Sequence, residues 1–182
     1  MASRTIIEGL YSQIESHRVR SVSGKFFIQQ SKVREIFTPV IARAVDELIC
    51  DAHERVGLAK KIKQEGTTTF AILVWMRRAD SIVRFRNHEC LDDKLPLHEE
   101  RACEIAPEFG LSFAREYQWQ FLPYFFKRDM CDYHREINEV GMIFPFVKVE
   151  HIAEGGFGEV SKLMISTSLQ EFFHSTVRAG SS

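Results

Sequence analysis

The chain has 182 residues, of which 45% are hydrophobic and 27% charged, and its formal net charge is −1. This length corresponds to between one and one and a half ordinary domains, and the apolar content is sufficient for a sizeable core. The nearly balanced charge gives no electrostatic reason to expect a nucleic acid or an anionic membrane as a partner. The sequence has no signal-peptide apolar region, and no apolar run approaches the roughly 20 residues that span a bilayer. We therefore expect an intracellular, cytoplasmic protein that binds neither a nucleic acid nor a membrane.

The first predicted element is a short amphipathic helix. Thr5 and Glu8 have the spacing of a capping box, and apolar residues follow at helical intervals as far as Ile14. After a polar stretch, Phe26-Phe27-Ile28 predicts a short strand.

A longer helical stripe runs from Val33 to Leu48, and Pro39 interrupts it. Because proline lacks an amide donor but suits the first position of a helix, we predict that one helix ends near Thr38 and that Thr38 caps the next. The apolar run from Thr69 to Met76 fits either a buried helix or a buried strand, and we predict a helix.

Metal-ligand residue types are frequent between His88 and Cys103. They are His88, Glu89, Cys90, Asp92, Asp93, His98, Glu99 and Cys103. Their spacing matches no standard zinc pattern, so we expect a surface loop in which Asp92 and Asp93 form a turn or a cap. No metal site is predicted, and the four widely spaced cysteines favour reduced thiols.

An aromatic segment extends from Tyr117 to Phe126, with Pro123 inside it. Such a segment either stacks nucleic-acid bases or fills a core. Base stacking normally comes with a basic groove, whereas Lys127 and Arg128 are followed by four acidic residues before Val140. We therefore expect a core and no nucleic acid.

A glycine-rich turn between two apolar stretches, His151–Val160, suits a strand–loop–strand unit that folds over nucleotide phosphates. In the pattern G-x-G-x-x-G-x-V, Gly155, Gly158 and Val160 are in register, and Ala153 replaces the first glycine. Backbone amides must approach phosphate oxygens closely, so the Cβ of Ala153 is expected to lower nucleotide affinity. The alternative is a plain β-hairpin whose glycines only supply positive φ.

Further stretches, taken together with the glycine-rich turn, carry a resemblance to a known family, and they occur in a consistent order. They are Thr69-Phe-Ala-Ile-Leu-Val-Trp75, Leu91-Asp-Asp-Lys-Leu-Pro-Leu97, Tyr117-Gln-Trp-Gln-Phe-Leu-Pro-Tyr-Phe-Phe126, and Phe144-Pro-Phe146 followed by Gly155-Gly-Phe-Gly-Glu-Val160. With them the chain resembles filamentous-fungal protein-kinase-like proteins, in which an α-rich region immediately precedes the catalytic domain. The resemblance covers most of the chain, from Ser31 to Phe172.

The resemblance implies ATP-dependent serine/threonine phosphotransfer, with ATP as cofactor. In such a kinase, Ile152 and Val160 would sandwich the adenine, and the amides from Gly155 to Gly158 would cover the phosphates. The nucleotide-binding candidates are therefore Ile152, Ala153, Glu154, Gly155, Gly156, Phe157, Gly158, Glu159 and Val160.

Catalytic parts of a kinase are missing from this sequence. The family's third strand carries a phosphate-anchoring lysine, whereas Lys162 lies too near the loop, on the expected second strand. Arg178 is nearer the usual distance, but a planar guanidinium replaces a point-charge ammonium poorly. The sequence ends at Ser182 without a catalytic loop or metal-binding motifs, so we expect a truncated kinase domain with no catalytic residues and weak ATP binding.

The predicted fold is mainly α with a small β part. Residues 1–141 form an α-rich N-terminal domain, and residues 142–182 form the start of a protein kinase domain, with an incomplete N-lobe β-hairpin over 146–165 and an irregular tail from Ser166. Two functions stay open: the ATP-binding N-terminal part of a serine/threonine kinase, or a non-catalytic protein-interaction module that retains a structural kinase remnant. Under either one, the protein partner is unknown.

Overall fold

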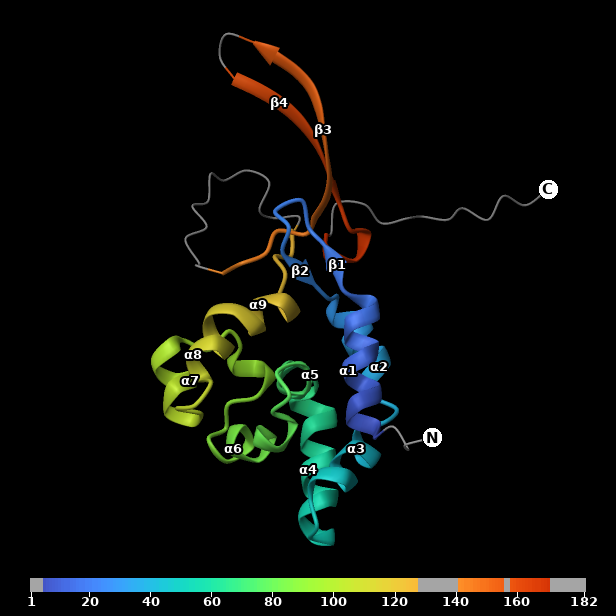
Figure 1. The fold of residues 1–182 in the computed structure, drawn as a ribbon, viewed down its shortest axis with the longest axis vertical. Coiled ribbons are helices and arrows are strands. Elements are labelled where there is room, and N and C mark those ends of the chain that lie inside the picture. The colour runs from blue at the N-terminus through green and yellow to red at the C-terminus, as the bar shows by residue number, and fades with distance from the viewer. Residues whose placement is uncertain (1–4, 128–140, 156–157, 171–182) are drawn as a thin grey trace, which may run out of the picture.

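The computed structural model describes residues 5–127, 141–155 and 158–170, and it is mainly helical with two small antiparallel hairpins (Figure 1). The predicted fold class, mainly α with a small β part, is thereby confirmed. The α-helices are α1 Ile6–His17, α2 Gln30–Phe37, α3 Ile41–Leu48, α4 Ala52–Glu65, α5 Thr67–Trp75, α6 Ile82–Asn87, α7 Glu99–Ile105, α8 Gly110–Ser112 and α9 Gln118–Phe121. The strands are β1 Val19–Arg20, β2 Phe26–Phe27, β3 Phe146–Gly155 and β4 Gly158–Ile165. Short turns are the 3₁₀ helices η1 Ala79–Ser81, η2 Asp92–Lys94 and η5 Thr167–Leu169, and the π-helix η3 Phe113–Tyr117.

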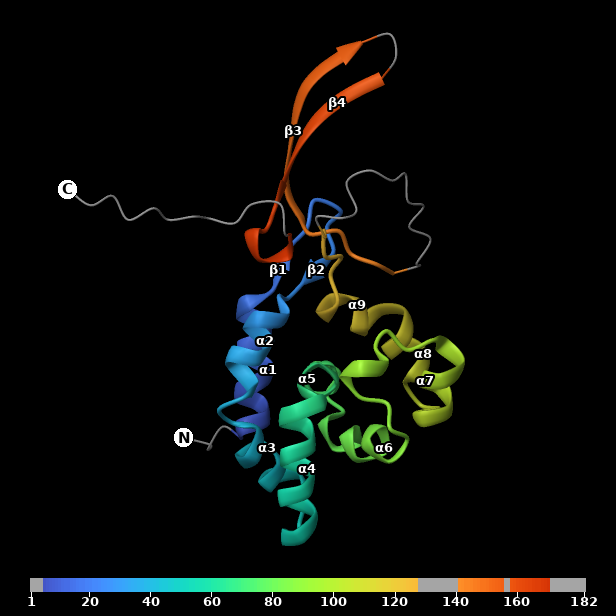
Figure 2. The same cartoon turned by 180° about the vertical axis from the view of Figure 1, so that it is seen from behind.

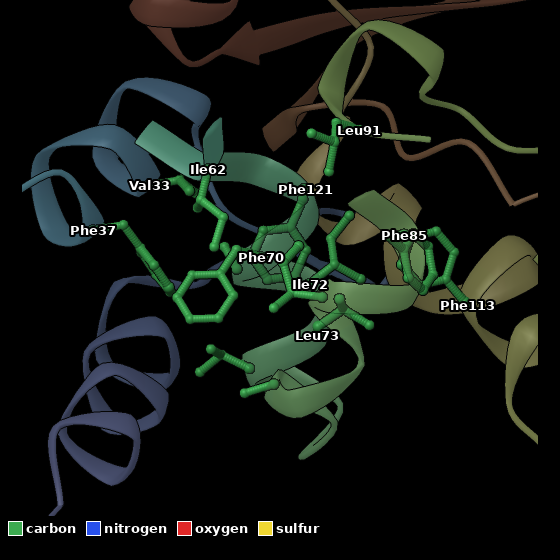
Figure 3. Packing of buried hydrophobic residues seen from close by; sticks show 14 of the residues in the cluster. Val33, Phe37, Ile62, Phe70, Ile72, Leu73, Phe85, Leu91, Phe113 and Phe121 are labelled. Carbon is green, nitrogen blue, oxygen red and sulfur yellow. The ribbon is translucent and has the colours of Figure 1, made fainter. Parts of the chain in front are cut away.

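Helix α5 is the centre of the helical body. Every residue from Thr67 to Val74 is buried, and α1, α2, α4, α6 and α9 all pack against this helix. Figure 3 shows Phe70 facing Phe37, with ring centroids 5.9 Å apart. The prediction of a buried helix here is confirmed. Among the described residues, none of the helices combines the length and the apolar character needed to cross a bilayer.

Asp92 supplies the N-terminal cap of α5 from a distance in sequence. Its carboxylate accepts hydrogen bonds from the Thr68 N–H at 2.9 Å, the Thr69 N–H at 2.8 Å and the Thr69 hydroxyl at 2.9 Å. Helix N-termini leave amides unsatisfied and favour negative charge, so this contact joins η2 to the core helix. The prediction that Asp92 forms a turn or a cap is confirmed, because it begins η2 and also caps α5.

Helix α1 begins where the sequence indicates. The Thr5 hydroxyl accepts a hydrogen bond from the Glu8 N–H at 3.1 Å, as in a capping box. The carboxylate of Glu8 forms an ion pair with Arg77 rather than turning back to close the box. Glu47 of α3 accepts the Ile6 N–H at 2.8 Å, and so takes over part of the capping.

The proline break is confirmed, but one detail of that prediction is wrong. Helix α2 ends at Phe37 and α3 begins at Ile41, so Pro39 lies in the turn between them. Thr38 does not cap α3: it has helical dihedrals, φ −51° and ψ −41°, and forms the C-cap of α2. An N-cap side chain needs an extended backbone, and Val40 stands at that position without a side-chain bond.

A second, smaller core joins the helical body to the C-terminal hairpin. Its buried members are Phe27, Trp119, Ile143 and Leu169. The prediction of an irregular tail from Ser166 is wrong for the residues as far as Gln170. Leu169 is buried in η5, and its carbonyl accepts the Phe126 N–H at 3.0 Å, because the β4 strand returns the chain to the helical body.

Candidate functional site

Strands β3 and β4 form a long hairpin that projects from the helical body, shown in orange in Figures 1 and 2. The last paired residues before the turn are Gly155 and Gly158, and Glu154 pairs with Glu159. The predicted pair of strands on either side of the glycines is confirmed, with the predicted bounds of 146 and 165.

A β-bulge interrupts the pairing on the approach to the glycine turn. His151 pairs with Ser161, whereas Ala153 pairs with Val160, so Ile152 is an extra residue on β3. The bulge breaks the strict alternation of faces on β3, so Ile152 and Ala153 together oppose the single residue Val160 of β4. Val160 alternates with Ser161 and therefore lies on the face opposite to the His151–Ser161 pair. The bulge thus brings the apolar residues on either side of the glycine turn to one face.

Both of these side chains are open to solvent. Ile152 is 60% exposed and Val160 is 57% exposed, although both are large aliphatic residues. Ala153 is exposed next to them. The backbone of Glu154, Gly155, Gly158 and Glu159 belongs to the paired strands. The two remaining candidates, Gly156 and Phe157, lie outside the described residues.

The opposite face of the hairpin is apolar as well. Val149 and Leu163 form a cross-strand pair there and are 46% and 44% exposed. Lys162 lies on β4, the predicted second strand, and it pairs with Glu150 on the other face, that of Val160. Five of the ten large hydrophobic residues exposed in the described part of the chain belong to this hairpin. The hairpin is therefore the main uncovered apolar surface of the described structure.

Aromatic rings fix the base of the hairpin. Phe144 and Phe146 stack with ring centroids 5.6 Å apart, and Tyr124 and Phe126 pack against them at 5.4 Å and 5.7 Å. The Val22 N–H also donates to the Phe146 carbonyl at 2.8 Å. The sequence predicts that the residues near Tyr124 fill a core, but the partners from 144 to 146 carry no periodic signal that would identify them. These ring contacts and this hydrogen bond fix the direction in which the β3–β4 hairpin leaves the helical body.

Comparison with protein-family models, with curated proteins and with solved structures gives no match for this chain.

Proposed function

We propose that the chain is the N-terminal part of a serine/threonine protein-kinase-like protein and that its β3–β4 hairpin binds ATP. The observation that carries the proposal is the bulge at Ile152, which supports a single apolar face formed by Ile152 and Val160 beside the glycine turn. Adenine is flat and largely apolar, so two exposed aliphatic side chains on one face suit one wall of an adenine site. Gly155 and Gly158 have no Cβ that would hinder the approach of phosphate oxygens to their backbone amides.

The proposed affinity is weak. A nucleotide site normally encloses most of its ligand, whereas the described hairpin contributes one wall. We do not propose Lys162 as the lysine that anchors the phosphates, because it lies on β4, where it pairs with Glu150. Phosphoryl transfer depends on positioned cations and a base around the phosphates. No residue of the described chain is therefore proposed as catalytic.

Saturation-transfer NMR with Mg-ATP tests the nucleotide proposal, because it detects millimolar binding. We expect saturation of the adenine protons that exceeds saturation of the ribose protons, since the apolar pair contacts the base. Ile152→Asp with Val160→Asp should abolish the signal by removing the apolar wall. Val149→Asp with Leu163→Asp is the matched control on the opposite face and should retain it. Equal signals in both variants, or none in the unmodified chain, would refute the proposal.

A second candidate function is a protein-interaction module, and the exposed strand surface favours it. Unpaired strand edges with apolar side chains accept further strands. A second copy of this chain is a suitable partner, because antiparallel pairing of two β3 strands about Val149 would set Lys148 opposite Glu150 in both directions. Opposite charges in cross-strand register stabilise such a pair.

Charge exchange tests this second function. We expect concentration-dependent dimers in sedimentation velocity runs of the unmodified chain. Glu150→Lys should abolish them by creating like-charge pairs, and Lys148→Glu combined with Glu150→Lys should restore them. A chain that stays monomeric at all concentrations, or a double variant that is no better than the single one, rules out this pairing.

A further inference from the structure

A cavity of about 240 Å³ lies where α1 ends, beside the β1–β2 hairpin and the π-helix η3. Three cationic side chains line it, from Arg18, Lys25 and Arg115, together with the carboxylate of Glu116 and the ring of Phe26. None of these residues belongs to the glycine hairpin, so this site is separate from the proposed nucleotide site.

Arg18 is the central group of the cavity. Its guanidinium carbon lies 4.4 Å from the centroid of Phe26 and 4.6 Å from that of Trp75. Ring contacts occupy the faces of a guanidinium, while its N–H donors project from the edge of the plane. Within the described residues, Arg18 Nε is buried without a hydrogen-bond partner, and no carboxylate is within ion-pair distance of the side chain.

An unsatisfied buried donor costs free energy that a ligand oxygen would recover. Burial lowers the pKa of Arg18, while Tyr11 and Glu15 oppose that effect, and a guanidinium keeps its charge in any case. The site therefore holds a partly buried cation with one buried N–H donor that no described residue accepts.

The other charges in the cavity leave a positive excess. Both oxygens of the Glu99 carboxylate accept from Arg115, at 2.7 Å each, so this guanidinium is largely neutralised. Lys25 is exposed and forms no ion pair with any described residue. Glu116 opposes anion binding. Among the lining residues, two cations against one carboxylate remain for a ligand, and Glu15 near Arg18 adds a second opposing charge outside the lining.

A second buried donor without a partner adjoins the same wall. Trp119 Nε1 lies behind Gly141, whose φ is +104°, and a Cβ at Gly141 would approach this nitrogen to 2.5 Å. Gly141 itself lines the cavity. Two of the three unpartnered buried side-chain donors in the described structure are thus at or beside this cavity.

We propose that the cavity binds a phosphate monoester, with Arg18 donating to two phosphate oxygens and Lys25 as a second cation. The guanidinium fork matches two oxygens of a phosphate, and the ammonium contributes a mobile point charge. A dianion gains more from two cations than a carboxylate does. The phosphate belongs either to a phosphorylated side chain or to a small phosphorylated molecule.

Isothermal titration of the full chain with two probes tests this site. The probes are inorganic phosphate and N-acetyl-O-phosphoserine amide, each titrated at constant ionic strength. Arg18→Gln should weaken binding at least about tenfold, as for loss of charge-assisted hydrogen bonds. Arg43→Gln, an exposed arginine on α3, is the matched control and should leave affinity unchanged.

Glu116→Gln keeps the test independent of folding defects. Removing this carboxylate should tighten phosphate binding by about two- to fivefold, as expected for one exposed charge. A variant that merely unfolds cannot gain affinity. Tighter binding of the phosphoserine probe identifies a phosphorylated side chain as the source, and equal binding of the two probes identifies a small phosphorylated molecule, because only the phosphate group is then recognised. No heat from either probe, or unchanged affinity in Arg18→Gln, would overturn the proposal.

Discussion

A row of stacked arginine and aromatic side chains links the first helix of this protein to its core. Arg77 lies 3.5 Å from the ring centroid of Tyr11, Tyr11 stacks on Trp75 at 4.6 Å, and Trp75 contacts Arg18, which in turn contacts Phe26. Cations over aromatic faces gain most where water is excluded. The indole N–H of Trp75 also donates to Gln120 at 3.2 Å. Trp75 is therefore the residue on which both this row of stacked side chains and the proposed phosphate site depend.

Replacing Trp75 with alanine should destabilise the protein by about 2–4 kcal/mol, because it removes a large ring from the core margin and two cation or ring contacts. Urea denaturation followed by circular dichroism measures this change. Leu111→Ala is the control, since Leu111 is 45% exposed, and its effect should stay within about 0.5 kcal/mol. A Trp75→Ala effect as small as that of the control would mean that the stack does not stabilise the fold.

At the scale of elements, local patterns in the sequence predict helix and strand identity well. The capping residue Thr5, the apolar run before Trp75 and the apolar stretches around Gly155 each depend on neighbours in the chain, and each is confirmed. Contacts between distant residues are different. Aspartate is a residue type that often caps helices, so Asp92 is a reasonable candidate. No local signal shows, however, that the helix it caps is α5, whose Thr69 lies 23 residues earlier in the chain.

The bulge at Ile152 is another feature that periodicity does not predict. Alternation along each strand assigns side chains to the two faces of that strand alone. Which residues of β3 and β4 share a face depends on the register of the pair, and that register includes the bulge. The π-helix from Phe113 to Tyr117 is likewise set by packing rather than by propensity. The sequence therefore identifies the residues of the candidate site, while tertiary packing decides which of them share a face.

The approach of α7 to α8 depends on one missing side chain. A Cβ at Gly110 would lie 2.2 Å from the carbonyl oxygen of Ala102, which is a backbone atom that cannot rotate away. Gly110→Ala should therefore destabilise the protein by about 1–3 kcal/mol through overpacking. Gly57→Ala is the matched control inside α4, where a Cβ meets nothing within 4 Å. It should stabilise by about 0.4–1 kcal/mol, and thermal denaturation of the two variants should shift in opposite directions.

At the scale of the whole molecule, the stabilising contacts are unevenly distributed. The main core extends through α1 to α9, whereas the second core has four buried residues and holds only the base of the β3–β4 hairpin. Beyond this base the hairpin projects away from the helical body (Figure 2). An isolated two-stranded hairpin is marginally stable in water. Its outer part is therefore expected to open independently of the helices.

Native-state hydrogen exchange measures this difference directly. Amides of α5 should exchange only through global unfolding, because every residue from Thr67 to Val74 is buried. Amides between Lys148 and Leu163 should be protected at least about a hundredfold less, through local opening.

Mg-ATP should raise protection in the hairpin alone if the nucleotide proposal holds, since a ligand that binds only the closed form stabilises it. Phosphate should instead protect amides near Arg18. Equal protection of the hairpin and α5 without ligand would show that they unfold as one cooperative unit, and a hairpin of that stability would need burial that its exposed aliphatic residues do not have.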